Sequence, residues 1–195
     1  MFDSIRGWKM SLWKKLSSKT LFQTGFFRLR VDECQLPDGR IQPQYYVMEF
    51  ADWVNVVPIT KDGQILMLRQ FRYGAGEEFW EIPGGSTHPG SAEAPRLAAE
   101  RELLEETGHQ ASEWIDCGFH YPNPSLQNNR MHTFVALGCE KISAQQLDPY
   151  EVLQVVPMPI AQAVKLWEDG SITHSLIEAS FGRALKVLRQ RGLVR

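Results

Sequence analysis

Three glutamates crowd one face of a short acidic segment in the middle of the chain. The segment PRLAAERELLEETG has the composition of a helix over Pro95–Thr107, and Gly108 is a typical residue to end it. At about 100° per residue, Glu102, Glu105 and Glu106 fall within one arc of that helix. Like charges at this spacing repel by roughly 0.2–0.5 kcal/mol per pair. A bound cation removes the repulsion, so the spacing indicates a metal site.

The chemistry of these ligands favours a small, hard divalent cation. Carboxylate oxygens suit Mg²⁺ or Mn²⁺, which keep several waters and share their ligands with substrate phosphates. The glutamates also lie in the last two turns, where the helix dipole favours a cation. The alternative is an exposed acidic face without a ligand. On the opposite side of the helix, we expect Leu97 and Leu104 to face a core.

The residues around this helix resemble the Nudix box, a loop–helix motif written G-x5-E-x7-R-E-U-x-E-E-x-G-U, where U is a bulky apolar residue. The run RELLEETG, from Arg101 to Gly108, matches the helical part position by position. Glu93 lies eight residues before Arg101, where the motif has its first glutamate. The preceding WEIPGG is similar to the family's strand and glycine turn.

The match departs from the motif in two places. The spacing from Gly85 to Glu93 is two residues longer than in the motif, giving G-x7-E, so the extra residues lie in the loop. Such an insertion costs little and leaves the helix register intact. It puts in doubt only the geometry of ligands on the loop side. The final apolar position holds His109, beyond the end of the helix.

The resemblance implies a role for each matching residue. Glu102, Glu105 and Glu106 are the expected metal ligands, and the backbone carbonyl of Gly84 is a further one because the turn aims it at the helix. Arg101 is expected to orient the carboxylates by charge-assisted hydrogen bonds, which places it with Glu105 among the catalytic residues. The alternative for Arg101 is an ordinary ion pair one turn away, with Glu105.

Two further glutamates receive expected roles from the resemblance. Glu93, with Gly85, is expected to support the loop and helix; Glu93 either holds the loop or favours the helix start, where an acidic residue is stabilising. In relatives that act on ADP-ribose, the general base is a glutamate on a loop after the box. Glu151, in LDPYEVLQVV, lies at about that place, and Asp148 is the alternative.

Three features resemble the ADP-ribose and nucleoside diphosphate-sugar pyrophosphatase branch of the family. They are the run RQFRYG before the box, the hairpin-rich N-terminal segment and the closing LWEDGSITHSLIEASFGRAL. This resemblance implies hydrolysis of ADP-ribose or a similar compound to a nucleoside monophosphate and a sugar phosphate. The alternatives are another nucleoside diphosphate derivative, such as a dinucleoside polyphosphate, or a ligand-sensing domain without catalysis. The base and the sugar stay open.

Several residues are candidates to bind such a substrate. Arg69 and Arg72 can pair with a diphosphate, but alternation along a strand gives them opposite facings, and we favour Arg72 because it begins the loop toward the box. Trp53, and also Tyr46 or Phe27, can stack on a base. The alternative for these aromatic residues is a place in the core or an interface.

The elements that must position these residues mix strands and helices without regular βαβ alternation. This pattern indicates an α+β fold with a mixed sheet, and the resemblance implies a Nudix-type α/β/α sandwich. We expect a small N-terminal antiparallel sheet in residues 1–50 and the hydrolase domain in residues 51–195. The expected elements are two strands between about Thr20 and Phe50, strands from Val54, from Gln64, in FWEIPGG, at Trp114–Phe119, Met131–Leu137 and Val152–Val156, and helices near Ile160–Glu168 and Ile172–Gln190.

The N-terminal segment is expected to form a homodimer interface, as the resemblance implies. Two strands alone are marginally stable, so their apolar side chains need a partner surface. The aromatic residues that require covering are Phe22, Phe26, Phe27, Tyr45 and Tyr46.

Composition sets the remaining limits. The 195 residues carry a net charge of −2, which provides no general attraction to nucleic acid or an anionic membrane. The start, MFDSIRGWKMSLWKK, has no apolar run of signal-peptide length, and no stretch is long enough to span a membrane. Cys34, Cys117 and Cys139 lack metal-ligand or redox spacing. We therefore expect a cytoplasmic enzyme whose partner is a small nucleotide-sugar.

Overall fold

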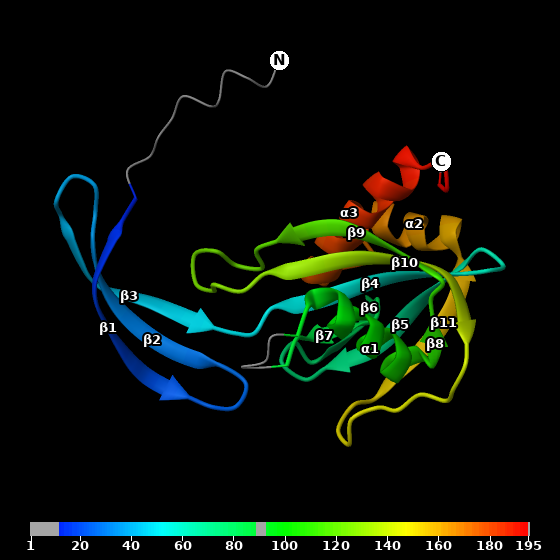
Figure 1. Ribbon diagram of the computed structural model, residues 1–195, viewed down its shortest axis with the longest axis horizontal. Coiled ribbons are helices and arrows are strands. Elements are labelled where there is room, and N and C mark those ends of the chain that lie inside the picture. The colour runs from blue at the N-terminus through cyan, green and yellow to red at the C-terminus, as the bar shows by residue number, and fades with distance from the viewer. Residues whose placement is uncertain (1–11, 89–92, 195) are drawn as a thin grey trace, which may run out of the picture. The chain divides into compact units, whose positions relative to one another are not determined.

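The computed structural model describes residues 12–88 and 93–194 (Figure 1). Residues 1–11, which hold most of the segment behind the signal-peptide expectation, lie outside this part. So do residues 89–92, in the loop that carries the two-residue insertion. The described chain divides into two units. The first comprises residues up to Phe50 together with Asn123–Asn128, and the second comprises Ala51–Pro122 and the chain from Asn129 onward.

The first unit contains an antiparallel sheet of three strands, whereas the sequence predicts two. The strands are β1 (Lys14–Gln23), β2 (Arg28–Gln35) and β3 (Ile41–Glu49), in the order β1-β2-β3. The prediction of two strands is wrong because it misses β1. This strand is exposed along its whole length, so its sequence KKLSSKTLFQ lacks the hydrophobic alternation of a half-buried strand. The predicted turn in LPDGR is confirmed, with Gly39 at a φ of 90°.

The second unit is built on a mixed sheet. Its order is β11-β5-β4-β10-β8, where β10 runs parallel to β4 and the other pairs are antiparallel. Three short strands extend it, because β6 pairs with β5, β7 with β4 and β9 with β10. The bounds are β4 (Trp53–Thr60), β5 (Gln64–Arg72), β6 (Glu77–Glu81), β7 (Gly84–Ser86), β8 (His109–Gln110), β9 (Glu113–His120), β10 (Met131–Lys141) and β11 (Leu153–Pro159).

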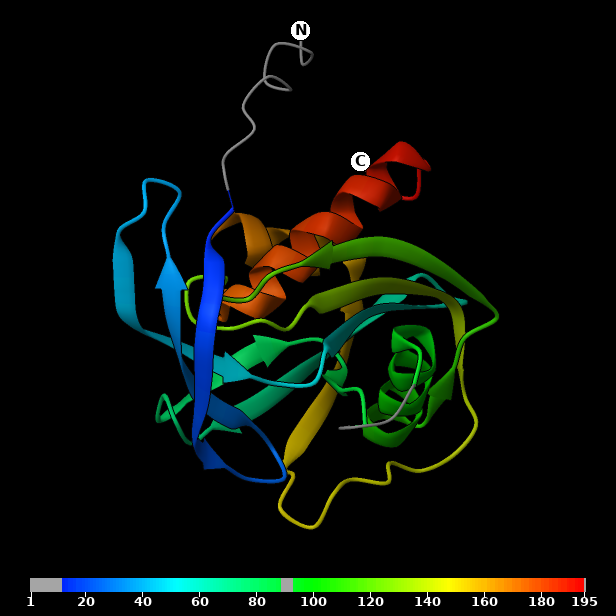
Figure 2. The ribbon, with the colours of Figure 1, turned by 60° about the vertical axis from the view of Figure 1, so that its left-hand side comes forward.

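Helices cover both faces of this sheet, which gives the predicted sandwich (Figure 2). Alternate residues of β4 divide between the faces. Val54 and Val56 pack with α1 (Pro95–Thr107), whereas Val57 and Ile59 belong to the larger core under α2 (Ile160–Glu168) and α3 (Ser175–Gln190). In the described ranges, none of the helices is long and apolar enough to cross a membrane.

The inner face of α1 differs from the predicted one. Leu97 is 56% exposed and Leu104 is only partly buried, whereas Ala98, Ala99 and Leu103 are fully buried. The small alanines let the helix approach β4 closely. The buried face of α1 is therefore centred on Ala98, Ala99 and Leu103, and not on Leu97 and Leu104 as predicted. As a result, part of the acidic face turns toward the protein. The predicted bounds of α1 and its end at Gly108, which has a φ of 72°, are confirmed.

The three cysteines are free thiols. Cys34 and Cys139 are buried and Cys117 is partly buried. Burial raises the pKa of Cys117 to about 11 and that of Cys139 to about 12, so both thiols are protonated and unreactive at neutral pH.

Candidate active site

The carboxylate of Glu106 is buried beneath the glycine turn that precedes α1. Glu106 is 2% exposed, and one of its oxygens accepts a hydrogen bond of 2.9 Å from the backbone N–H of Gly84. Burial raises the pKa of Glu106 well above its ordinary value, and the charges of Glu102 and Glu151 raise it further. The site therefore holds a carboxylate whose charge lacks a full counter-charge from the protein.

Glu102 lies directly against Gly85. A Cβ atom on Gly85 would lie 2.3 Å from one carboxylate oxygen of Glu102, a separation that real atoms do not adopt. Glycine at this position therefore leaves the space that the Glu102 carboxylate occupies, and a larger residue would displace that carboxylate. Burial also raises the pKa of Glu102, although the neighbouring Arg101 opposes that shift. Two acidic groups with raised pKa values thus face the same turn.

Arg101 joins the helix to the turn. Its Nη1 donates to Glu102 at 2.8 Å and to Glu105 at 3.0 Å, and its Nη2 donates to the backbone carbonyl of Ser86 at 2.9 Å. Arg101 thus contacts two of the carboxylates, and one of these contacts is the ion pair with Glu105, its i+4 neighbour. Glu105 is the most exposed of the three helix carboxylates, since Glu102 and Glu106 are largely buried.

Glu93 contacts the two ends of the box loop. Its carboxylate accepts a hydrogen bond from the backbone N–H of His88 at 2.8 Å and lies 2.8 Å from the His88 ring. It also lies 3.5 Å from Nε of Arg101. The residue that caps the start of α1 is Ala94, which makes no side-chain capping bond. These contacts link Glu93 to His88 in the loop and to Arg101 of α1.

Glu151 lies near the buried carboxylates although it is far from them in sequence. It is partly buried at the end of the loop before β11. Its charge contributes to the raised pKa values of both Glu102 and Glu106. Asp148 is exposed, and its backbone carbonyl accepts a hydrogen bond of 2.9 Å from the Glu151 N–H. The structure therefore brings Glu151 to the same region as the box glutamates.

Arg72 contacts a buried acid that sequence reasoning missed. Nε and Nη2 of Arg72 donate to the two carboxylate oxygens of Glu81 at 2.8 and 2.5 Å. This hydrogen bonding raises the pKa of Arg72, and the charges of Glu106 and Glu151 add to the effect. Glu81 is 1% exposed. The signal was an acidic residue between the apolar Trp80 and Ile82 in a predicted strand, because a charge that becomes buried there requires a partner.

The structure gives other contacts for the remaining candidate substrate residues. Arg69 bonds Glu78 at 2.8 Å and lies over the ring of Trp80, on the face of β5 opposite to Arg72. Trp53 begins β4 and alternates with Val54, which faces α1. In the first unit, the ring of Phe27 stacks on Phe50 and the hydroxyl of Tyr46 donates to Gln44.

The three helix glutamates fit a divalent cation, although in this structure they contact other groups of the protein. Within residues 12–88 and 93–194, no three His, Cys, Asp or Glu side chains converge as a ready metal site. Arg101 holds Glu102 and Glu105, and Gly84 holds Glu106. A cation bound here would draw these carboxylates from those partners. Hard oxygen donors with raised pKa values are the set that Mg²⁺ or Mn²⁺ would stabilise.

Comparison with known protein families gives two matches along the chain. Residues 13–48 match the nucleoside diphosphate sugar hydrolase N-terminal domain, and residues 50–178 match the NUDIX domain. The chain is also similar to two curated proteins named ADP-ribose pyrophosphatase. The one from Mycobacterium tuberculosis is 31% identical over 162 residues, which cover 83% of this chain and 77% of the relative. The one from Bacillus subtilis is 29% identical over 163 residues, which cover 82% and 85%.

The fold matches a solved structure as well. A crystal structure described as an ADP compounds hydrolase superposes with a TM-score of 0.80 at 24% identity, over 95% of this chain and 98% of that one. This likeness shows the fold alone. The NUDIX match spans more than half of the chain and includes the loop, the helix and the buried glutamates described above. The chain therefore belongs to the Nudix family and is a hydrolase of its pyrophosphatase type.

Proposed function

We propose that this enzyme hydrolyses the pyrophosphate of nucleoside diphosphate sugars, with ADP-ribose as the first substrate to test. The products are a nucleoside monophosphate and a sugar phosphate. The observation that carries the proposal is the group of acidic side chains at the glycine turn, with Arg72 close by. The names of the two pyrophosphatase relatives support the choice of substrate.

We assign metal binding to Glu102, Glu105, Glu106 and the backbone carbonyl of Gly84. Members of this family generally use divalent metal cations, and we propose Mg²⁺ or Mn²⁺ here. Such a cation, when bound, polarises a phosphoryl oxygen and lowers the pKa of a water molecule. The burial of Glu102 and Glu106 supports this assignment, because it gives two carboxylates a need for positive charge.

The remaining residues are assigned to substrate and to proton transfer. Arg72 uses Nε and Nη2 toward Glu81, and we assign its Nη1 to the diphosphate. Trp53 is kept as a platform for the base, while Arg69 is the second choice for the phosphates. Glu151 is the proposed general base, because its charge acts on the box glutamates from a separate loop. Arg101 and Glu93 hold the helix and the loop in register.

The proposed bond cleavage is tested with ADP-ribose in ¹⁸O-water. We expect AMP and ribose 5-phosphate, with the label in one of the two phosphates, because the charge that the site stabilises develops at phosphorus. Mass spectrometry of both products measures the result. Label in free ribose, with ADP as the other product, contradicts the proposal, because water would then have attacked the C5 carbon of the ribose and not a phosphorus. A panel that adds dinucleoside polyphosphates and deaminated nucleotides decides among the alternatives.

Chelation tests the metal assignment in the same assay. With EDTA we expect hydrolysis to fall to background, and added Mg²⁺ or Mn²⁺ to restore it, because the carboxylates otherwise repel one another. Added Na⁺ at matched ionic strength is the control. Turnover that persists in EDTA at its original rate rejects the metal site.

We also propose that the enzyme is a homodimer through the sheet of the first unit. Large apolar side chains of this sheet are exposed in the single chain, including Leu16, Leu21 and Phe22, at 45%, 46% and 54%. Burying such a surface is worth roughly 25 cal/mol per Å². Light scattering at micromolar concentration should report twice the 22.3 kDa chain mass. Changing Leu21 and Phe22 to Asp should yield monomer, whereas Lys19→Ser should not; a monomeric parent protein contradicts the proposal.

A further inference from the structure

The loop that carries Glu151 has no helix or strand of its own. It runs from residue 142 to 152 between β10 and β11, and Glu151 lies close to its end. A segment of this length has many conformations unless it is tied to the rest of the protein. A general base must lie within hydrogen-bonding reach of the proton that it removes. The contacts that fix this loop therefore decide whether Glu151 is in place.

Four hydrogen bonds tie the loop to the C-terminal end of α1. The backbone N–H groups of Ile142 and Ser143 donate to the carbonyl of Gly108 at 2.9 and 3.2 Å. The backbone N–H of Gln146 donates to the carbonyl of Glu105 at 2.8 Å, and Nε2 of Gln145 donates to the carbonyl of Glu106 at 2.6 Å. The last carbonyls of a helix lack partners within it, so these donors satisfy groups that the helix leaves open.

The Gln145 bond differs from the other three because a side chain makes it. It ends on Glu106, whose carboxylate is bound at the same time by Gly84. One residue of the box thus contacts both the glycine turn and the loop of the proposed base. Gly108 permits this approach, because a Cβ atom there would lie 2.2 Å from the carbonyl oxygen of Ser143.

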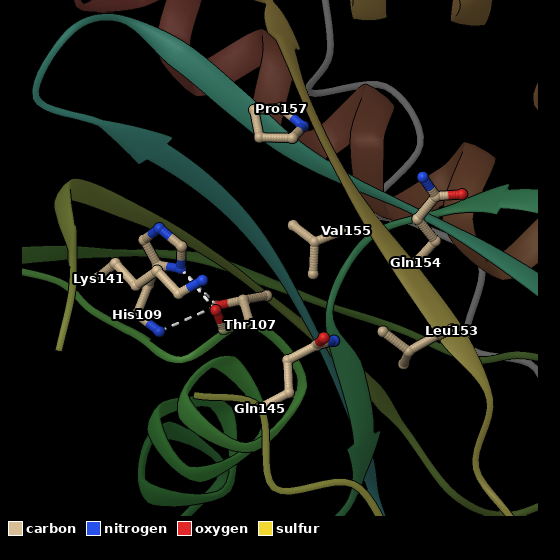
Figure 3. Close-up of a pocket in the computed structure, with 8 residues that line it drawn as sticks. All are labelled: Thr107, His109, Lys141, Gln145, Leu153, Gln154, Val155 and Pro157. Atoms are coloured by element: carbon tan, nitrogen blue, oxygen red, sulfur yellow. Dashed lines mark hydrogen bonds between the residues drawn. The ribbon is translucent and has the colours of Figure 1, made fainter. Parts of the chain in front are cut away.

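The hydrogen bond between Gln145 and the Glu106 carbonyl lies beside an open space. A pocket of about 440 Å³ lies between the end of α1 and β11, and Gln145, Thr107, Leu153 and Val155 are among its lining residues (Figure 3). Figure 3 shows the Gln145 side chain extending into this space toward β11. The loop is therefore fixed here by hydrogen bonds more than by close packing, so the loss of one bond is not compensated by neighbouring apolar contacts.

We propose that Gln145 is a positioning residue for the reaction: its hydrogen bond to the backbone of Glu106 sets the place of Glu151 relative to the carboxylates of α1. The inference rests on the proposed role of Glu151 as general base. Gln145 itself need not touch the substrate. It acts by coupling the loop to the helix that carries the metal ligands.

The test compares Gln145→Glu with Gln146→Ala under saturating Mg²⁺ and ADP-ribose. An ionised glutamate keeps the shape of Gln145 but cannot donate to the Glu106 carbonyl, so we expect kcat to fall about tenfold with KM changed less than twofold. Gln146→Ala is the matched control, because Gln146 bonds through its backbone and should keep its activity within twofold. Gln145→Ala should behave like Gln145→Glu, and thermal melting checks that each variant folds.

A double-variant cycle separates positioning from a general structural effect. In a Glu151→Gln background, Gln145→Glu should reduce kcat by less than twofold, because the base that it positions is already absent. If the full tenfold loss recurs in that background, or if Gln145→Glu alone has no effect, the positioning role is overturned. If Glu151→Gln alone reduces kcat by less than threefold, Glu151 is not the general base. The positioning role of Gln145, which depends on that assignment, is then rejected as well.

Discussion

Glu106→Gln is expected to reduce kcat for ADP-ribose by about 10²-fold or more, while the metal-free protein melts at the same or a higher temperature. The substitution removes a charged ligand from the proposed metal site, which lowers activity. It also removes a buried negative charge that Glu102 and Glu151 repel, which favours the folded state. The measurements are steady-state kinetics with Mg²⁺ and thermal melting in EDTA.

The pH dependence of stability gives an independent check on Glu106. Because burial raises its pKa, the folded protein holds a proton that the unfolded chain has already released. Without metal, stability should thus decline as the pH rises from the ordinary glutamate value of 4.5 toward the raised pKa. Glu102 contributes in the same direction. Urea unfolding in EDTA should show a smaller decline for Glu106→Gln than for the parent protein.

A matched control for this prediction lies on the same helix. Glu100 forms an ion pair with Arg96 one turn away. Glu100→Gln changes the charge equally, and we expect its kcat within twofold of the parent value. A Glu106→Gln enzyme that melts well below the parent but keeps its kcat per molecule would instead assign Glu106 a structural role.

Glu151→Gln is expected to reduce kcat by about 10²-fold with little change in the Mg²⁺ concentration needed for half-maximal activity. A general base contributes roughly 10²–10⁴-fold to such a reaction, and Gln retains the shape of Glu without its basicity. Metal titrations of kcat measure both quantities. Asp148→Asn is the matched control, since Asp148 is exposed in the same loop. A loss below about threefold would move the role to Asp148 or to a box glutamate.

The local parts of the site were predictable from the sequence because they depend on residues close together in the chain. The bounds of α1, its end at Gly108 and the clustering of Glu102, Glu105 and Glu106 follow from helix periodicity and from the glycine. The strands around Asp62-Gly63 and the helix Ile160–Glu168 were also predicted correctly, since turn residues and apolar patterns mark them.

The exposed strand β1 and the inner face of α1 were not predictable in the same way. A strand that buries no face shows no hydrophobic alternation, so only its pairing with β2 identifies it. The orientation of α1 depends on how closely Ala98 and Ala99 let it approach β4. That distance depends on how the two elements pack together, so the sequence of either element alone does not predict it.

The sequence alone determined which residue types form the site: three carboxylates on a helix, a glycine turn before it, and an arginine within it. Tertiary structure decided their environments, burying Glu102 and Glu106 more than Glu105. It also paired Arg72 with Glu81, and it tied Gln145 to the end of α1. The physical reason is that helix geometry is set by neighbours in the chain. Burial, and with it the pKa of a carboxylate, is set by segments distant in sequence that fold against it.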